Sequence, residues 1–501
     1  MQIKYFLLLI TLAFFVQNQL MSDLLKKAFD LETFRRNGHQ VIDLLAAQLE
    51  KTLDPSGFHT IDRISPQEQL AHWAFDLGKD AIDSPNELFK DIIAHSVNLQ
   101  SPGYLGHQVS PALPLTALTS ALTGFMNNGM AVYEMGMAAN AMEKIVIGWL
   151  ADKFGLGNQA AGVITSGGTL GNLTALLAAR ASVTDIWEDG SHDDQPLAVL
   201  VSEEAHFSID RAARIIGLGK SGVIRVPVDD QLRMRTDLLE TYYRQALADG
   251  KKVICVIGCS CSTSTGTFDN LEAIGAFASA HKVWFHIDGA HGAPVIFSDR
   301  YKHLIDGIHR ADSIVVDFHK MMLAPSLSTA VLFKNGSAKA NTFSQNALYI
   351  YQNEPEDWFN SGKYTFECTK PATIFHTYAI VRQYGDELYR QNIDTLFGLA
   401  AQFTSIINDS ADFELAHEPQ SNIVCFRYKC DECPDSLNRQ ILEKVINAGK
   451  FYIVSTSVNG EFYLRISIMN PLTTIDNLKT LLNDIREFAH QLQGSLTAKQ
   501  T

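Results

Sequence analysis

The sequence predicts an α/β protein whose large domain has a mostly parallel sheet, with a helical segment before it and a small α+β domain after it. Between about residues 162 and 334, short β-rich runs alternate with amphipathic helical runs. Residues 24–99 instead place apolar side chains at steps of three and four, as in VIDLLAAQL, which is the helical period. The 501 residues are 46% hydrophobic and 19% charged, which is typical of a folded globular chain.

The N-terminus opens with an apolar extension, residues 1–21. Lys4 precedes an apolar run at 5–16 that resembles the core of a signal peptide, but the following VQNQLMS has no small-x-small cleavage site. The run is also too short to span a bilayer. Because Met21 begins a stretch typical of a soluble protein, we expect a cytoplasmic protein without a membrane partner, with export as the alternative. Residues 22–100 form the predicted helical segment.

The large domain is predicted at residues 101–375. Its expected strands are the runs GVIT, AVLVS, GVIRVPV, KVICVIG, VWFHID, SIVVDF and STAVLF. Its expected helices are the runs GNLTALLAAR, DRAARIIG, TDLLETYYRQAL, NLEAIGAFASA and KHLIDGI. This alternation favours parallel strands with helices on both faces, an arrangement in which ligands bind beyond the carboxyl ends of the strands.

The small domain is predicted at residues 376–495, with helices first, then the strands NIVCFRY and FYLRISI, and a last helix near 476–492. The net charge of −14 argues against a nucleic-acid partner, because phosphate binding needs a basic face. Seven cysteines are too few for a disulfide scaffold. Cys430 and Cys433 form a lone CxxC that we interpret as part of a loop, so we expect no metal.

A glycine-rich turn at residues 166–172 (SGGTLGN) leads from the run GVIT into a helix. Glycines let the backbone approach an anion closely, and a helix N-terminus offers free N–H groups and the positive end of a dipole. Gly167, Gly168 and Thr169 are therefore candidates for a phosphate site. The alternative is an ordinary strand-to-helix turn.

Three more candidate residues follow the ends of predicted strands: His206 after AVLVS, Asp288 at the end of VWFHID and Lys320 after SIVVDF. A structural histidine, a helix-capping aspartate and a solvated lysine are the alternatives. A desolvated lysine beside other cations, however, becomes an amine that forms Schiff bases. With a phosphate cradle, a histidine facing the ring and a carboxylate for a pyridine nitrogen, it supplies what pyridoxal 5′-phosphate (PLP) requires.

The same segments resemble those of the group II PLP-dependent amino-acid decarboxylases, which include glutamate, cysteine-sulfinate, aromatic-amino-acid and 2,4-diaminobutyrate decarboxylases. The resemblance covers about residues 34–489 and implies the fold-type I, aspartate-aminotransferase-like architecture. The matching motifs are ITSGGTLGNLTALLAAR, SEEAHFSIDRAA, TSTGTFDNLEAIG, HIDGAHGA and DFHK.

Through these motifs, the resemblance assigns the Schiff base to Lys320, ring stacking to His206 and the contact with the pyridine nitrogen to Asp288. It implies further roles beside the cofactor for other residues of the motifs: Thr263, Ala290, Asp317, and His319 as a relay for a proton.

Further matches bear on the reaction. SQNALYIYQ supplies Tyr349 where the family carries a tyrosine that protonates the substrate's α-carbon from the other subunit of a dimer. Oxidative, aldehyde-forming relatives have phenylalanine there, so Tyr349 favours decarboxylation to an amine and CO2. FYLRISIMNP resembles a strand whose arginine, here Arg465, binds a substrate carboxylate; a surface charge at a strand edge is the alternative. PGYLGHQ puts His107 in the substrate pocket by the same resemblance.

The sequence also departs from the family. Asp317 stands where many members have asparagine, Gly289 replaces an alanine, and Lys370 within TKP replaces an anchoring arginine. The resemblance implies a small acidic or diamino substrate without choosing between them. An aminotransferase, an oxidative aldehyde synthase and a non-catalytic homologue are the alternatives. We expect a homodimer with shared active sites, in which residues 22–100 contribute to the interface.

Overall fold

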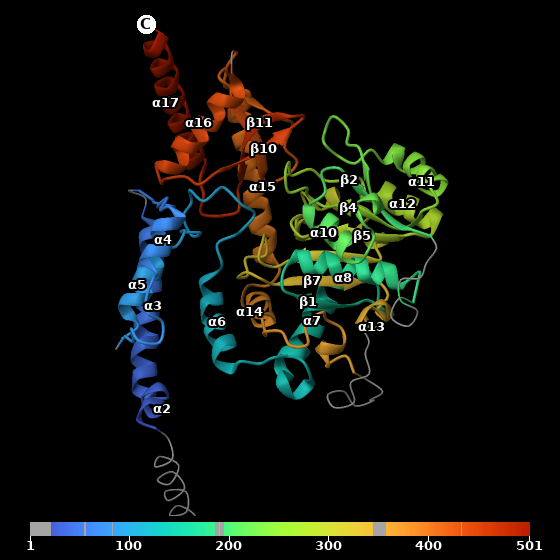
Figure 1. The fold of residues 1–501 in the computed structure, drawn as a ribbon, viewed down its shortest axis with the longest axis horizontal. Coiled ribbons are helices and arrows are strands. Elements are labelled where there is room, and N and C mark those ends of the chain that lie inside the picture. The colour runs from blue at the N-terminus through green and yellow to red at the C-terminus, as the bar shows by residue number, and fades with distance from the viewer. Residues whose placement is uncertain are drawn as a thin grey trace, which may run out of the picture. The chain divides into compact units, whose positions relative to one another are not determined.

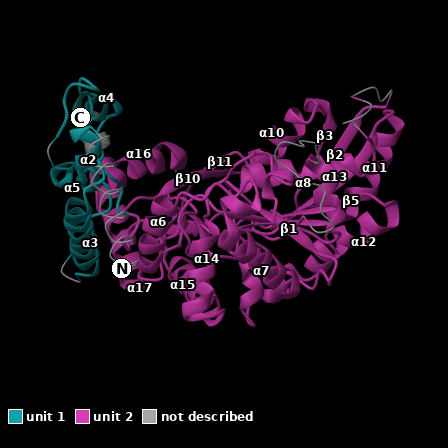
Figure 2. Ribbon diagram, turned by 90° about the horizontal axis from the view of Figure 1, so that it is seen from below, with its two compact units in different colours: residues 1–98 teal, residues 99–501 magenta. Residues whose placement is uncertain are grey.

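The computed structural model describes residues 22–54, 57–82, 84–185, 190, 195–343, 357–431 and 433–500. The chain divides into two compact units, residues 1–98 and 99–501 (Figure 2). Within the described part of the chain, no helix has both the length and the apolar character needed to cross a membrane.

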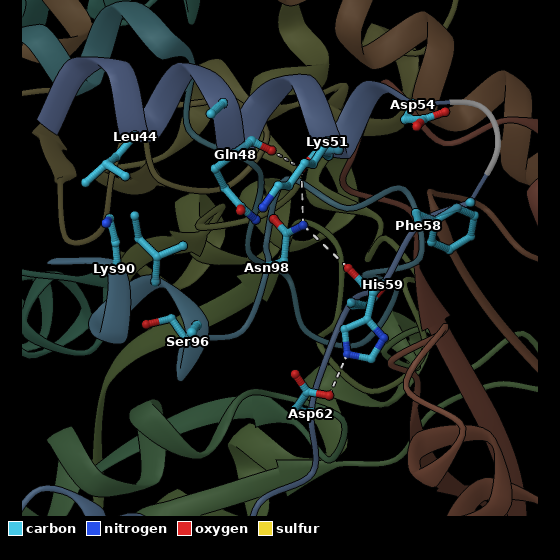
Figure 3. A pocket seen from close by; sticks show the side chains of 16 residues that line it. Leu44, Gln48, Lys51, Asp54, Phe58, His59, Asp62, Lys90, Ser96 and Asn98 are labelled. Carbon is cyan, nitrogen blue, oxygen red and sulfur yellow. Dashed lines mark hydrogen bonds and ion pairs between the residues drawn. The ribbon is translucent and has the colours of Figure 1, made fainter. Parts of the chain in front are cut away.

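The first unit is helical and has almost no core of its own. Its helices are α2 (Asp23–Ala28), α3 (Leu31–Leu53), α4 (Pro66–His72) and α5 (Asn86–Ala94). Among the residues of these four helices, only Thr52 is buried. A cavity of about 740 Å³ lies between α3, α5 and the segment 57–62 (Figure 3). There Asn98 donates to the hydroxyl of Thr52 over 3.2 Å and to the carbonyl of His59 over 3.5 Å, so these hydrogen bonds help to connect the segments.

The second unit contains a seven-stranded sheet in the order β1-β7-β6-β5-β4-β2-β3. The strands are β1 (Ala161–Thr165), β2 (Leu197–Ser202), β3 (Val223–Val226), β4 (Lys252–Cys259), β5 (Trp284–Asp288), β6 (Ser313–Asp317) and β7 (Thr329–Phe333). All neighbouring pairs from β6 to β3 are parallel, whereas β7 is antiparallel to both β1 and β6. The predicted mostly parallel sheet is confirmed, and β7 turns back because the connection 318–328 contains no crossover helix.

Helices of the second unit pack on this sheet (Figure 1). Those beside the sheet are α7 (Met137–Lys153), α8 (Gly168–Ala181), α10 (Phe207–Ile215), α11 (Leu239–Ala248), α12 (Leu271–His281) and α13 (Ser337–Phe343). The helices α6 (Pro114–Met126) and α14 (Ile374–Tyr384) pack against each other, and α14 also packs against α7. Leu176 of α8 and Ile209 of α10 share one apolar cluster with Val199 of β2 and Ile257 of β4. The continuous apolar strand sequences follow from burial of the sheet beneath such helices.

One predicted helix, KHLIDGI, is wrong. The segment forms two 3₁₀ turns, η5 (Lys302–Ile305) and η6 (Ile308–Arg310). Gly307 separates them with a φ of +95°, in the left-handed region that favours glycine. A Cβ at this position would lie 2.5 Å from the backbone nitrogen of Glu272, so close packing against the start of α12 also requires glycine.

The C-terminal part of the second unit has a four-stranded antiparallel sheet in the order β10-β11-β9-β8. Its elements are α15 (Glu387–Asn408), β8 (Phe413–Leu415), β9 (Ile423–Tyr428), α16 (Pro434–Asn447), β10 (Val454–Val458), β11 (Glu461–Ser467) and α17 (Ile475–Gln500). The predicted strands NIVCFRY and FYLRISI are β9 and β11, and the last helix extends beyond its predicted end. Phe403 packs edge to face on Phe426, which anchors α15 on the sheet.

Candidate active site

A cavity of about 500 Å³ lies where β1, β2, β4, β5 and β6 end at the same edge of the large sheet. It collects every predicted site residue that the structure describes except Arg465. These residues are His107, Gly167, Gly168, Thr169, His206, Thr263, Asp288, Ala290, Asp317, His319 and Lys320. Tyr349 lies outside the described residues. The carboxyl ends of parallel strands therefore bring together side chains that are far apart in the sequence.

The glycine-rich turn forms an open N-terminus for α8. Gly167 is the N-cap residue, has a φ of 100° and provides no capping side chain, so the first N–H groups of the helix remain available to an anion. A Cβ on Gly168 would lie 3.2 Å from both carboxylate oxygens of Asp317. Glycine at this position keeps the turn close to the end of β6.

Lys320 reaches the cavity from the turn that follows β6. Its Nζ lies 3.1 Å from Oδ2 of Asp317, whose side chain is almost completely buried. The other carboxylate oxygen of Asp317 accepts a hydrogen bond from the hydroxyl of Thr329. His319 is buried beside them, with its Nε2 3.6 Å from Oδ2 of Asp317 and its Nδ1 3.0 Å from the carbonyl oxygen of Ser328. Asp317 thus holds the lysine amine at the cavity wall.

Asp288 is held by Asn172, the last residue of the glycine-rich motif SGGTLGN. Asn172 donates through Nδ2 to Oδ2 of Asp288 over 2.9 Å, and its Oδ1 lies 3.0 Å from Nε2 of His286. Burial lowers the pKa of His286 to about 4, against an opposing effect of Asp288, so this ring is neutral near pH 7. Because Asn172 uses its nitrogen toward Asp288, its oxygen accepts the Nε2 proton of His286. In the sequence, the histidine within the apolar run VWFHID was the feature that could have pointed to this contact.

His206 is connected to the same network. It is the N-cap of α10, and its Nδ1 accepts the backbone N–H of Ser208 over 3.3 Å. The hydroxyl of Ser208 lies 2.8 Å from that Nδ1 and accepts from Asn172 over 2.9 Å. Burial lowers the pKa of His206, Lys320 lowers it further, and Asp288 opposes them. The result favours a neutral imidazole in a fixed orientation, which suits stacking on an aromatic ring.

Arg465 on β11 lies next to the cavity wall. Its Nη1 donates to the carbonyl of Gly106 over 3.3 Å, and Gly106 precedes His107, which lines the cavity. The alternative of a surface charge at a strand edge is wrong, because only 5% of Arg465 is exposed. Among the described residues, its buried Nε and Nη2 have no hydrogen-bond partner. Burial lowers the pKa of His107, and the positive charge of Arg465 lowers it further. The Nε2 of His107 lies 3.1 Å from the hydroxyl of Tyr452.

Two departures from the family pattern have structural explanations. Lys370 does not line this cavity; it is buried against Glu143 at 2.7 Å and donates to the carbonyl of Ile164 at 2.9 Å, so it ties β1 to α7. At Gly289, a Cβ would lie 2.7 Å from the Cβ of Ala293 and 2.9 Å from the carbonyl oxygen of Val315. Alanine would not fit there without a shift of its neighbours.

The residues present fit PLP. An uncapped helix N-terminus suits the phosphate, a buried carboxylate held by Asn172 suits a protonated ring nitrogen, and a lysine amine at the cavity wall suits the aldehyde. A neutral histidine beside them suits the face of the ring.

The sequence matches the family described as the pyridoxal-dependent decarboxylase conserved domain over residues 79–429. It is 26% identical to an aromatic-L-amino-acid decarboxylase of Bacillus atrophaeus, over 93% of this chain and 97% of that protein. It is 29% identical to an L-2,4-diaminobutyrate decarboxylase of Acinetobacter baumannii (80% and 83% covered) and 29% identical to an L-aspartate decarboxylase of Metarhizium robertsii (83% and 84%). The crystal structure of mouse CSAD shares the fold, with a TM-score of 0.85, 24% identity and coverage of 92% and 99%.

The match to the family model covers most of the chain and includes the strand ends that form the cavity. The chain therefore belongs to the pyridoxal-dependent decarboxylases and is a carboxy-lyase that uses PLP to remove the carboxylate of an amino acid.

Proposed function

We propose that this enzyme decarboxylates a small L-amino acid with an acidic side chain and that Arg465 binds the side-chain carboxylate of the substrate. The supporting observation is a buried guanidinium whose Nε and Nη2 have no acceptor among the described residues. A buried charged donor without a partner is costly unless a ligand supplies the acceptor. A carboxylate meets this need because it accepts two parallel hydrogen bonds from a guanidinium.

A short diamino acid is the second candidate. It is favoured by the DFHK motif, in which Asp317 offers a carboxylate to an ammonium group, and by the diaminobutyrate decarboxylase among the relatives. Asp317, however, already pairs with Lys320 and accepts from Thr329. Arg465 would in addition repel the second ammonium group, so the charges beside the cavity favour the acidic substrate.

For the cofactor, we propose that Lys320 binds it covalently, that Asp288 keeps its ring nitrogen protonated and that His206 stacks on its ring. Gly167, Gly168 and Thr169 would hold the phosphate at the start of α8, and Thr263, Ala290 and Asp317 complete the proposed contacts. When bound, PLP supplies an electron sink for the electron pair that stays on the α-carbon as CO2 leaves. Asn172 would keep the carboxylate of Asp288 directed at the nitrogen.

The α-carbon must then receive a proton, and we propose Tyr349 as its donor with His319 as a relay. Tyr349 lies outside the described residues, so the support for its role is the resemblance of SQNALYIYQ to the family's motif. The position of His319 supports the relay, because it is buried next to Lys320 with its Nε2 near Asp317. A buried imidazole is suited to pass a proton without admitting water.

We further propose a cytoplasmic homodimer with shared active sites, in which residues 22–100 pack against the second copy. Leu24, Phe29, Phe34 and Leu70 of the first unit are 61–80% exposed. Helices that bury so little of their own apolar surface are not stable alone in water, and exposed apolar patches of this kind mark interaction surfaces. Within the second unit, we propose residues 101–375 as the cofactor domain and 376–495 as the small domain.

The experiment is a panel of L-amino acids assayed with purified holoenzyme, measuring CO2 and amine together. Arg465→Gln should lower kcat/KM for acidic substrates by about 100-fold, while neutral substrates of the same length lose far less, because a buried charged hydrogen bond contributes up to about 3 kcal/mol. Arg439→Gln, a change elsewhere in the small domain, is the matched control. An equal loss for all substrates would assign Arg465 to the α-carboxylate and remove the basis for an acidic substrate.

A further inference from the structure

A second, smaller cavity lies in the second unit, apart from the active site. It has a volume of about 160 Å³ and lies beside β1, α7 and α13, with the segment 357–364 as a further wall. Among the described residues, it has no lining residue in common with the active-site cavity. The side chains that give it chemical character are Glu143, Lys144, Lys339, Trp358, Ser361 and Tyr364.

The charges around this cavity do not balance. Glu143 is paired with Lys370 at 2.7 Å, and Asp357 is paired with Lys363 at 2.9 Å. Lys339 and Lys144 are left over: their ammonium groups lie 3.8 Å above the ring of Tyr364 and 4.3 Å above the ring of Trp358. Neither has a carboxylate partner in the described part of the chain. The two ammonium groups without carboxylate partners would therefore be stabilised by a bound anion.

Lys339 is the cation whose charge is destabilised by burial. Burial lowers its pKa to about 8, with Lys370 and Lys144 lowering it further and Glu143 and Asp357 opposing them. An ammonium group with so little water around it gains more from a bound anion than an exposed surface lysine would.

One carboxylate oxygen of Glu143, in the wall of the cavity, lacks a hydrogen-bond donor among the described residues. Only 6% of Glu143 is exposed, and its Oε2 is buried without a hydrogen-bond partner among the described residues. Its other oxygen, Oε1, is used by Lys370 and by the backbone N–H of Ile164. The serine in the wall cannot serve Oε2, because the hydroxyl of Ser361 donates to Asn140. A ligand that satisfies both ends must therefore carry an anionic group and an N–H or O–H donor.

The volume of the cavity limits the size of the ligand. An internal cavity of roughly 150 Å³ holds a ligand of about six non-hydrogen atoms. A three-carbon amino acid has that size and carries both charges. We propose that this cavity binds a small zwitterionic amino acid, with its carboxylate at Lys339 and its ammonium group at Oε2 of Glu143. The walls formed by Trp358 and Tyr364 cover its carbon chain.

The probe is 3-aminopropanoate, titrated into holoenzyme while tryptophan emission and the visible absorbance of the cofactor are recorded together. Binding in the cavity should change the emission of Trp358, and the change should disappear in Trp358→Phe. Lys339→Met should weaken this binding at least tenfold, whereas Lys334→Met, a change at an exposed lysine nearby, should leave it unaltered. Propanoate and propylamine, which each carry one of the two charges, should bind the wild-type protein at least tenfold more weakly.

Two results would overturn the proposal. One is an emission change that follows the cofactor absorbance with the same midpoint and persists in Lys339→Met, because the ligand would then occupy the active site alone. The other is propanoate binding as tightly as 3-aminopropanoate to the wild-type protein, because Glu143 would then have no role. The second comparison needs no variant, so it decides even where Lys339→Met does not fold.

Discussion

Asn172 donates a hydrogen bond of 2.9 Å to the carboxylate of Asp288, although the two residues lie on different elements, α8 and β5. Its other side-chain atom is held by His286 at 3.0 Å, so the amide cannot turn away from the carboxylate. The strand end that carries Asp288 and the helix that follows the glycine-rich turn are thereby fixed to each other. Asn172, the last residue of a motif noted for its glycines, therefore orients the carboxylate that we propose as the partner of the cofactor's ring nitrogen.

Replacing Asn172 with alanine should lower kcat by about 10- to 100-fold and leave KM nearly unchanged. The reason is that a hydrogen bond to a charged group contributes about 1.5–3 kcal/mol, and Asp288 would lose its fixed direction rather than its charge. Steady-state kinetics and the affinity for PLP measure the effect. Ser208→Ala, which keeps the contact between Asn172 and Asp288, should cost less; equal losses would show that Asn172 has no special part.

Asp288→Ala should fold normally and lose about 100- to 1000-fold in kcat, because a ring nitrogen without a carboxylate partner makes a poorer electron sink. Circular dichroism checks the fold and a CO2 assay checks turnover. Near-normal activity in this variant would mean that the carboxylate has only a structural role, as acceptor for Asn172 and for the backbone N–H of Ala290 at 3.3 Å.

Acid should destabilise the protein partly through His286. Its pKa is about 4 in the folded chain and about 6.5 when unfolded. Between these values the unfolded chain binds a proton that the folded chain does not, so the free energy of unfolding falls as the pH is lowered from 6.5 to 4. The contribution is about 1.4 kcal/mol per pH unit, or about 3 kcal/mol in all.

His286→Gln keeps a donor for Asn172 but removes the titrating ring. Urea unfolding at pH 7 and pH 5, at one protein concentration, should show a smaller loss of stability in the variant than in the wild type, by about 2 kcal/mol. An unchanged pH dependence would show that folding does not lower the pKa of His286.

Mixed dimers test the shared active site. Lys320→Ala and Tyr349→Phe subunits should each be inactive in amine formation, and mixing them should partly restore activity. If Tyr349 acts across the interface, each heterodimer has one site that lacks both groups and one that is intact. Confirmed heterodimers without activity would mean that Tyr349 serves its own subunit, and a monomer at working concentration would contradict the proposed dimer altogether.

Much of this fold could be predicted from the sequence, because buried strands appear as continuous apolar runs, and the seven predicted runs match the seven strands of the large sheet. The antiparallel β7 and the 3₁₀ turns at KHLIDGI could not, since they depend on the length of a connection and on the close approach of Gly307 to Glu272. Most of the predicted cavity residues follow the ends of strands, and strand ends can be located from the apolar pattern of the sequence. The pairing of Asn172 with His286 and the burial of Arg465 depend on which elements meet, and no local pattern encodes that.

The most direct test of the proposed activity is the specificity of the wild-type holoenzyme for L-aspartate against L-2,4-diaminobutyrate, with CO2 and amine measured in the same reaction. Equal amounts of CO2 and amine, with a kcat/KM at least tenfold higher for L-aspartate, are the predicted result. The reason is that two buried donors of Arg465 have no acceptor among the described residues, so this cation should favour a second carboxylate and repel a second ammonium group. A preference for L-2,4-diaminobutyrate would contradict the acidic substrate, and a keto acid formed without CO2 would contradict decarboxylation itself.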